Sequence, residues 1–216
     1  ISDPEDPRRV FSWLLEEARD DRGNVVRYTY KAEDAAGVDR GSASESNRFV
    51  DGELRATAQR YLKRIEYGNR SPNDTSRWLF EVVFDYGEHD ESAPTPEEAR
   101  AWPARRDAFS TYRPGFEVRT YRLCRRVLMF HRFDELGPEP YLVRSTDLDY
   151  EHRDHLSALL RITQAGYLRD DRTGTYERAT LPPLDLAYVE RKVHTDVRAL
   201  EAGALDGIPG GVDGTA

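Results

Sequence analysis

The sequence has little cysteine, no long apolar run and no excess of basic residues, and each of these absences excludes a class of protein. A single cysteine, Cys124, excludes an internal disulfide and gives no signal of a redox compartment. No apolar run approaches the roughly 18 residues that a membrane-spanning helix needs, and no signal segment is expected after Ile1. Acidic residues outnumber basic ones by 40 to 32, which disfavours a nucleic-acid or anionic-membrane binder, because such a binder needs a basic patch.

What remains indicates a soluble, globular chain. Its 216 residues suit one domain or two small ones, and its aromatic content of 11% is too high for a disordered chain. Lysine occurs only at Lys31, Lys63 and Lys192, so 29 of the 32 basic residues are arginine. Arginine suits sheets rich in tyrosine and carboxylates, because it pairs with carboxylates in a planar fork and stacks on aromatic rings. Codon bias in a GC-rich genome gives the same composition, so both explanations stand.

Runs of β-branched and aromatic residues predict a mainly β fold. The predicted strands are residues 9–18, 25–31, 61–67, 78–86, 142–150, 159–168 and 184–189, while residues 116–133 are long enough for two strands or for one with a bulge. Between the first two strands, Gly23 and Asn24 end an acidic turn and predict a β-hairpin.

Helical signals are weak and loop signals are strong. Residues 52–62 predict a short helix, and residues 96–101 predict a single helical turn that begins at a proline. Residues 34–51 and 88–96 are polar and predict long loops. Residues 201–216 are rich in glycine and predict a linker.

The pattern apolar-x-Tyr recurs along the chain. Its tyrosines, which are Tyr30, Tyr67, Tyr86, Tyr150 and Tyr188, lie 37, 19, 64 and 38 residues apart. These separations are close to multiples of about 20 residues, which is typical of a repeated strand-and-turn unit. Chance recurrence of tyrosine in strands is the alternative.

Neither face of the predicted strand segment 116–133 is cleanly apolar. This pattern is expected for a sheet that contacts solvent on both sides, or for a strand that changes sheets part-way.

Catalytic motifs are incomplete. His152, Arg153 and Asp154 match the start of a kinase catalytic loop, but its other elements are missing, so a polar loop is the better interpretation. His152 and His155 have the spacing of a metal-binding pair without a third ligand. Cys124 has arginine neighbours that could lower its pKa, although a buried, inert thiol is the more frequent role.

Carboxylates and tryptophans give no defined site either. The acidic pairs are Glu16/Glu17, Asp20/Asp21, Asp147/Asp149 and Asp170/Asp171. A glycosidase needs two acids across a cleft, which adjacency in sequence does not establish, and the pairs at 20 and 170 are typical of capped turns. Of the possible aromatic platforms Trp13, Trp78 and Trp102, the first two lie in predicted strands and are expected in the core. We therefore expect no catalytic, cofactor-binding or metal-binding residue.

Several long motifs resemble one family. RVFSWLLEE (9–17), DDRGN (20–24), YTYKAED (28–34), YLKRIEYGN (61–69), WLFEVVFDYGEH (78–89), FEVRTYRLCRRVLMFH (116–131), VRSTD (143–147) and LPPL (181–184) follow one another in the order of that family. The chain is similar to the SpvB-type N-terminal region of the B component of bacterial Tc insecticidal toxin complexes. The resemblance covers most of residues 8–190.

The resemblance implies a fold and partners. It implies antiparallel strand-turn-strand sheets of the RHS/YD type that form part of a larger hollow β-shell, with long loops and at most short helices. The B and C components of that family build the shell around the toxic C-terminal part of C, and a β-propeller in B docks onto the A component. The implied function is thus a non-catalytic wall segment of a secreted toxin that needs no cofactor. Its implied partners are the rest of its own B component, including the propeller, the RHS-repeat C component with its cargo and, indirectly, the A-component channel, with no nucleic acid and no membrane.

The expected organisation is a single shell domain over residues 1–200, cut at both ends, and a linker over residues 201–216 that leads toward a propeller. Besides a stand-alone binding module, which a closed barrel or sandwich with no open edge would favour, two other functions stay open. One is the N-terminal region of a single-chain, SpvB-like ADP-ribosylating toxin, in which the catalytic motif lies outside the residues seen here. The other is a carbohydrate-active β-protein, for which a cleft with two acids about 5–10 Å apart would be the deciding observation.

Overall fold

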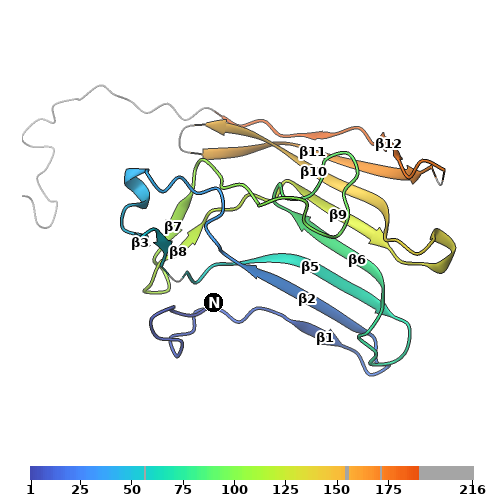
Figure 1. Cartoon of the computed structure of the whole chain (residues 1–216), viewed down its shortest axis with the longest axis horizontal. Helices are drawn as coiled ribbons and strands as arrows, with labels where there is room; N and C mark the ends of the chain where they lie inside the picture. Colours follow the sequence, from blue (N-terminus) through green and yellow to red (C-terminus); the bar gives the residue numbers. More distant parts are fainter. Residues whose placement is uncertain (56, 154–155, 171, 190–216) are drawn as a thin grey trace, which may run out of the picture. The chain divides into compact units, whose positions relative to one another are not determined.

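Antiparallel strands make up nearly all of the regular secondary structure, as the sequence predicts (Figure 1). The computed structural model describes residues 1–55, 57–153, 156–170 and 172–189. In these residues, nine strands form one open sheet in the order β1-β2-β5-β6-β9-β10-β11-β12, with β13 also paired to β11. Residues 1–186 form one unit. Residues 187–216 form a second unit, of which 187–189 are described and lie in no helix or strand.

Neighbouring strands of the large sheet are mostly close in sequence. It contains β1 (Glu17–Arg19), β2 (Val25–Ala32), β5 (Arg60–Asn69), β6 (Trp78–Asp85), β9 (Arg126–His131), β10 (Tyr141–Arg153), β11 (Leu156–Arg169), β12 (Tyr176–Thr180) and β13 (Leu184–Asp185). Two small hairpins, β3 (Phe49–Val50) with β4 (Glu53–Leu54) and β7 (Phe109–Thr111) with β8 (Val118–Thr120), lie outside it. The helical elements of the described residues are two 3₁₀ turns, η1 (Ala43–Glu45) and η2 (Asp134–Leu136).

The predicted hairpin between the first two strands is confirmed, but its first strand is shorter than predicted. Of the predicted strand 9–18, only Glu17 and Ala18 belong to β1, which pairs with β2, so the rest of that segment lies outside the sheet. The turn depends on Gly23, whose φ is 79° and whose added Cβ would lie 2.8 Å from Pro72 Cβ. A side chain at this position would therefore be strained by both the backbone conformation and the contact.

The predicted helix at 52–62 is wrong. Residues 49–54 form the hairpin β3–β4, whose turn residues Asp51 and Gly52 have φ angles of 52° and 81°. Positive φ at both central residues is typical of a type I′ turn, for which Asp-Gly is a preferred sequence. The predicted helical turn at 96–101 is also wrong, because these residues form no helix. Residues 88–96 form a loop as predicted, and the predicted loop 34–51 contains η1 and β3.

The segment 116–133 contains two strands that belong to different sheets. β8 pairs with β7 in a small hairpin, whereas β9 lies between β6 and β10 in the large sheet. This confirms the alternative in which the chain changes sheets part-way. It also explains the mixed faces, because the segment has no single inward side along its whole length.

The two faces of the large sheet differ in burial. One cross-strand row joins Arg64, Val83, Leu128, Ser145 and Ala165, and its last four residues are buried. This face carries the cluster of Val83, Leu128, Phe130 and Leu142, against which Tyr167 and Tyr176 pack. Most of the alternate residues of β6 and β9, among them Val82 and Met129, are only half-buried, although Trp78 at the start of β6 is buried. Residues 86–106 hydrogen-bond to side chains of the first face, which we call the loop face.

Two glutamates of the loop face lie opposite each other. Glu66 on β5 pairs with Glu81 on β6. Glu81 is buried and held by Arg64 at 2.8 Å and Arg132 at 2.6 Å. Burial and the Glu81 carboxylate raise the pKa of Glu66, against the opposing effect of nearby arginines. Because this folded-state pKa lies above the unfolded-state value, the ionised Glu66 costs stability at neutral pH, and the cost disappears as the pH falls through the folded-state pKa.

Glu66→Gln is therefore expected to stabilise the chain at pH 7 by about 0.2–1 kcal/mol, because it removes a like-charge cross-strand pair. The gain should shrink on acidification, since wild-type Glu66 then takes up its own proton. Urea denaturation of both chains between pH 7 and pH 4 measures this trend. Glu177→Gln, at an exposed position on β12, is the control that should change little. A loss of stability at pH 7 would contradict the expectation.

Candidate functional site

The polar loop expected at His152 and Arg153 is wrong, because both residues form the exposed end of strand β10. The Nδ1 atom of His152 lies 3.0 Å from Ser157 Oγ, and that hydroxyl donates to Asp107 Oδ1 at 2.8 Å. Serine, histidine and aspartate thus meet at the tip of the β10–β11 hairpin. Asp154 and His155, the other residues of the kinase-like and histidine-pair patterns, lie outside the described residues.

The order of this group differs from that of a hydrolytic triad. A triad places histidine between serine and aspartate so that the ring takes the serine proton. Here Ser157 lies in the middle and donates its proton to Asp107. Arg105, at 2.7 and 2.9 Å, keeps the pKa of the Asp107 carboxyl well below its usual value, so this group stays ionised. Since Asp107 also accepts the Ser157 amide at 2.6 Å, the contact anchors the hairpin.

Cys124 lies half-buried between β8 and β9. Burial raises the pKa of its thiol to about 12, and the negative charges of Asp85 and Glu88 act in the same direction. The net shift of this pKa is upward although the Lys63 charge opposes it, which agrees with the buried, inert thiol that the sequence favours and not with a thiol activated by arginines. The thiol instead contacts the carbonyl oxygen of Arg126 at 3.5 Å.

The folded chain is expected to react with a disulfide reagent at pH 8 at least about 100-fold more slowly than the urea-unfolded chain, because the thiolate is the reactive species. Absorbance of the released thiol dye, with and without urea, measures both rates. Equal rates in the two states would contradict the expected pKa. Since Cys124 is the single cysteine, no other thiol contributes to the signal.

The acidic pairs divide into turn caps and paired surface groups. Asp20 accepts the amides of Arg22 and Asn24 at 3.0 and 2.8 Å, and Asp170 accepts that of Arg172 at 2.8 Å, which confirms the capped turns. Asp171 lies outside the described residues. Asp147 and Asp149 both line a cleft of about 650 Å³, but they lie side by side on β10 and do not face each other across it. Glu17 forms an ion pair with Arg19.

The three tryptophans have contrasting positions. The expectation that Trp13 lies in a strand and in the core is wrong. The residue lies outside every strand of the described residues, and its side chain is 87% exposed. Trp78 is buried, as expected. Trp102 is fully buried, and its ring packs edge-on against Tyr61 and Tyr86.

Among the described residues, no helix is long and apolar enough to cross a membrane.

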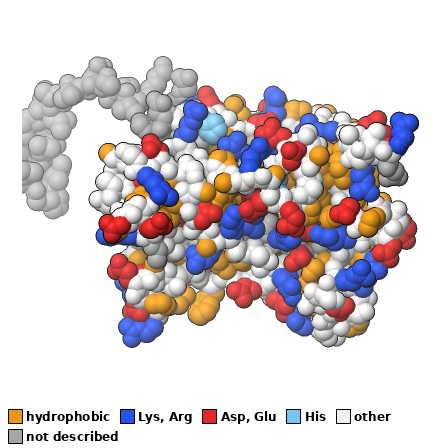
Figure 2. Space-filling view, in the orientation of Figure 1, with side chains coloured by type: hydrophobic (Ala, Val, Ile, Leu, Met, Phe, Trp, Pro, Cys, Tyr) orange, Lys and Arg blue, Asp and Glu red, His pale blue; other side chains and the backbone are white. Residues whose placement is uncertain are grey.

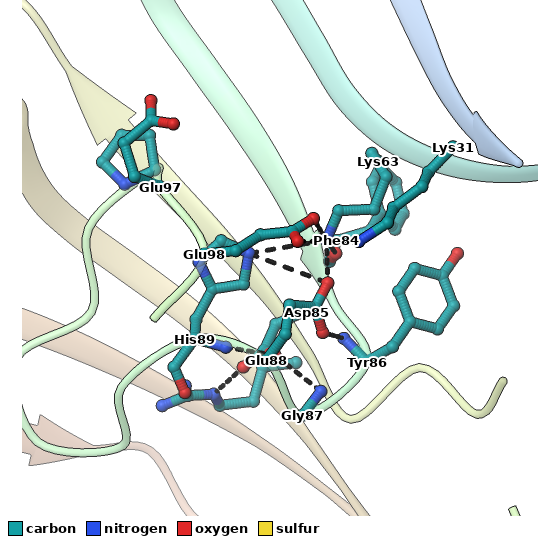
Figure 3. Close-up of polar contacts among 12 residues, drawn as sticks. Lys31, Lys63, Phe84, Asp85, Tyr86, Gly87, Glu88, His89, Glu97 and Glu98 are labelled. Carbon is teal, nitrogen blue, oxygen red and sulfur yellow. Dashed lines mark hydrogen bonds and ion pairs between the residues drawn. The ribbon is translucent and has the colours of Figure 1, made fainter. Parts of the chain in front are cut away.

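A buried ionic cluster at the end of β6 is the most distinctive chemical feature of the structure. The Lys63 amine of β5 donates to the carbonyl oxygen of Phe84 at 2.9 Å and forms an ion pair with Glu88 Oε1 (Figure 3). The Nε2 atom of the His89 ring lies 3.4 Å from this amine and 3.9 Å from Glu88 Oε1. Glu88 and His89 are fully enclosed. We call Lys63, Asp85, Glu88 and His89 the lysine cluster.

The cluster joins the loop to the sheet. Asp85 accepts Arg126 Nε at 2.6 Å and the amide of Gly87 at 2.7 Å. Although burial opposes it, the Arg126 charge lowers the pKa of Asp85. Glu88 Oε2 accepts the Tyr86 amide at 2.7 Å, so both of its oxygens are bonded. These contacts satisfy the buried charges and fix where the chain leaves β6.

A second buried network closes the other end of the same loop. Arg122 is fully buried and binds the carboxylates of Glu33 and Asp34. It also donates to the carbonyl oxygens of Ala36 at 2.7 Å and Trp102 at 2.8 Å. The guanidinium lies over the Trp102 ring, 4.3 Å from its centroid. The network therefore ties residues 33–36, 102 and 122 to one another.

Asp85, Glu88 and His89 have ligand atoms within 4.8 Å of one another and are the residues of the described chain that could hold a metal ion. Sequence reasoning missed this group and its lysine. The available signals were YLKRIEYGN and WLFEVVFDYGEH, which carry all four residues of the lysine cluster, and the rarity of lysine itself. Neither signal shows that residue 63 meets residues 88 and 89.

Comparison with known proteins identifies the family. Residues 1–133 match the family model described as SpvB, Salmonella virulence plasmid 65kDa B protein. The chain belongs to the SpvB family. It is 37% identical over 184 residues to the mono(ADP-ribosyl)transferase SpvB of Salmonella typhimurium strain 14028s, a match that spans 79% of this chain and 30% of the relative. The SpvB-family chain thus spans about a third of the length of that curated relative.

Solved structures agree with the family membership. The crystal structure of TcdB2-TccC3-Cdc42 superposes with a TM-score of 0.72 at 35% identity, covering 88% of this chain and 9% of that one. The Photorhabdus luminescens Tc holotoxin pore gives 0.71 at 36% identity, covering 87% and 9%. The N-terminal domain of SpvB from Salmonella typhimurium strain LT2 gives 0.69 at 39% identity, covering 77% and 54%. The chain is therefore related to the SpvB N-terminal domain and to components of Tc toxins.

Proposed function

We propose that this SpvB-family chain is a non-catalytic wall segment of a toxin-encapsulating β-shell, which helps to sequester and deliver a toxic C-terminal cargo. The observation that carries the proposal is the match of 88% of the chain, at 35% identity, to part of a TcdB2-TccC3 complex. The open antiparallel sheet supports it, because such a sheet can continue at its edges into a larger wall. In this proposal residues 1–200 are wall and residues 201–216, which lie outside the described part, are linker.

The side chains support a structural role. The buried charges of the lysine cluster and of Arg122 are bonded to one another or to backbone groups. Ser157, His152 and Asp107 meet in an order that anchors a hairpin. Burial raises the pKa of the Cys124 thiol to about 12, so this residue is a poor nucleophile at neutral pH. The proposed partners are the rest of the B component with its propeller, an RHS-repeat C component and, through the propeller, an A-component channel, in a complex that acts outside the bacterium.

Co-expression of the full-length parent protein with the RHS-repeat component encoded beside it tests this proposal. Co-purification as one particle, with the C-terminal cargo resistant to added protease, is the expected result. Separate elution of the two proteins, or digestion of the cargo at the rate of the free C component, would overturn it. Cargo mixed with an unrelated protein of similar size is the control for non-specific protection.

The N-terminal region of a single-chain ADP-ribosylating toxin is a second candidate function. It is favoured by the 37% identity to mono(ADP-ribosyl)transferase SpvB over 79% of the chain. Incubation of the full-length parent with labelled NAD⁺ and host-cell lysate separates the two candidates. Label transfer by a parent that binds no RHS-repeat component supports the second function, whereas particle formation without transfer by the parent supports the first.

A further inference from the structure

The Lys63 amine is surrounded by atoms of the kinds that bind divalent metal ions. Besides Glu88 Oε1 and the Phe84 carbonyl oxygen at 2.9 Å, it faces His89 Nε2 at 3.4 Å and Glu98 Oε1 at 3.8 Å (Figure 3). Two carboxylates, one imidazole nitrogen and one carbonyl oxygen therefore converge on a single cationic atom. Carboxylate and imidazole groups are common zinc ligands.

The imidazole is also oriented as a metal ligand would be. His89 Nδ1 donates to the carbonyl oxygen of Thr95 at 2.9 Å, so Nε2 carries the free lone pair and points at the amine. A ligating histidine usually has its second ring nitrogen hydrogen-bonded to a carbonyl or carboxylate in this way. The Thr95 contact thus fixes the tautomer and holds Nε2 toward the centre of the cluster.

The charges of the cluster balance with the lysine in place. Arg126 neutralises Asp85, and Lys63 neutralises Glu88. Glu98 is shared between Lys63 and Lys31, whose amine lies 2.7 Å away. Removing the Lys63 amine would leave Glu88, which is fully enclosed, without a counter-charge, and a buried unpaired carboxylate is strongly unfavourable.

We propose that the Lys63 amine is an internal substitute for a divalent metal ion, and that it closes residues 86–98 onto the sheet as a structural metal would. A side chain in the place of a metal makes this closure independent of metal supply and resistant to chelators. The same geometry implies that loss of the amine converts the lysine cluster into a zinc site, built from Asp85, Glu88 and His89, whose ligand atoms lie within 4.8 Å of one another. This inference does not depend on the proposed function.

Refolding of the 216-residue Lys63→Ala chain from urea, with ZnCl₂ or with EDTA, tests the inference. Without metal the variant should be much less stable than wild type or should not refold. With Zn²⁺ in large excess its melting temperature should rise by roughly 5–10 °C, or folding should be restored, because a ligand that binds only the folded state stabilises it. Wild type should show no shift. Co²⁺ in place of Zn²⁺ should give the visible absorption bands of a protein-bound, low-coordinate ion.

Two further variants separate metal binding in the cluster from non-specific effects. Lys63→Leu fills the volume of the lysine chain with apolar groups and should show no zinc response. In Lys63→Ala/His89→Ala the imidazole ligand is lost, so the zinc response of the single variant should disappear. Absence of any metal-dependent change in Lys63→Ala, whether the chain is folded or unfolded, would overturn the proposal. An equal response in the double variant would do so as well.

Discussion

Replacing Trp102 with alanine is expected to destabilise the fold by about 3–5 kcal/mol, the range for truncating a buried large aromatic side chain. Trp102 is fully enclosed, and its ring centroid lies 5.3 Å from that of Tyr61 and 6.0 Å from that of Tyr86. Lys31 and Arg122 lie over the same ring, 4.1 and 4.3 Å from its centroid. The truncation therefore opens a cavity and removes aromatic and cation–π contacts together.

Urea denaturation followed by far-ultraviolet circular dichroism measures this loss. Trp102→Phe is the matched control, because it keeps an aromatic ring and removes the hydrogen bond from Nε1 to Asp34 Oδ1 at 2.6 Å. It should lose less than half as much stability as the alanine variant. A second control, Trp13→Ala, changes a side chain that is 87% exposed and should cost about 0.5 kcal/mol or less. If Trp102→Ala also fell in that range, residues 86–106 would not be packed on the sheet as described.

The strands of this fold could be predicted because their pattern is local. β5, β6, β10 and β11 coincide with predicted runs to within a few residues, since β-branched and aromatic residues mark strands directly. The hairpin at Asp51–Gly52 was missed although Asp-Gly is a strong turn signal, because the polar residues around it matched a helix start equally well. The exposed position of Trp13 was missed because strand propensity does not show whether an edge segment pairs.

The buried ionic clusters could not be predicted from the sequence, because they join residues that are far apart in it. Arg122 contacts Glu33 across 89 positions, and Lys63 contacts Glu88 across 25. A charged residue in a strand ordinarily faces solvent, so Lys63 and Glu81 carry no local sign of burial. The large loop, residues 86–106, is what encloses them, and its path over the sheet depends on these contacts. The positions of the buried charges and the path of residues 86–106 therefore depend on each other.

Figure 2 shows acidic and basic side chains interspersed across the displayed face, with apolar groups between them. Opposite charges are also paired on the loop face, where Arg64 and Arg132 bind Glu81 and Arg126 binds Asp85. A sheet held by paired charges and small apolar clusters can be stable with one covering layer. The second face of the sheet keeps half-buried apolar side chains, among them Val82 and Met129.

The second large effect is expected for Arg122→Met, at about 3–5 kcal/mol, the range for breaking a buried ion pair from one side. Every N–H of this guanidinium has a partner: Nε–H and one Nη2 hydrogen bind Glu33, the other binds Asp34, and the Nη1 hydrogens bind the Ala36 and Trp102 carbonyls. Methionine keeps most of the volume and none of these bonds. Glu33, whose side chain is fully enclosed, would then be a buried charge without its partner.

Arg122→Lys and Arg122→Met/Glu33→Gln distinguish the charge from the geometry of its donors. Lysine restores the charge but cannot make five fork-shaped bonds, so Arg122→Lys should recover less than half of the lost stability. The double variant should recover more, because it removes the unpaired buried carboxylate that makes the single variant costly. Arg161→Met, at an exposed ion pair with Asp185, is the matched control and should cost at most about 1 kcal/mol. If Arg122→Lys were as stable as wild type, the charge alone would suffice, and the bonds to Ala36 and Trp102 would contribute nothing to closing the loop.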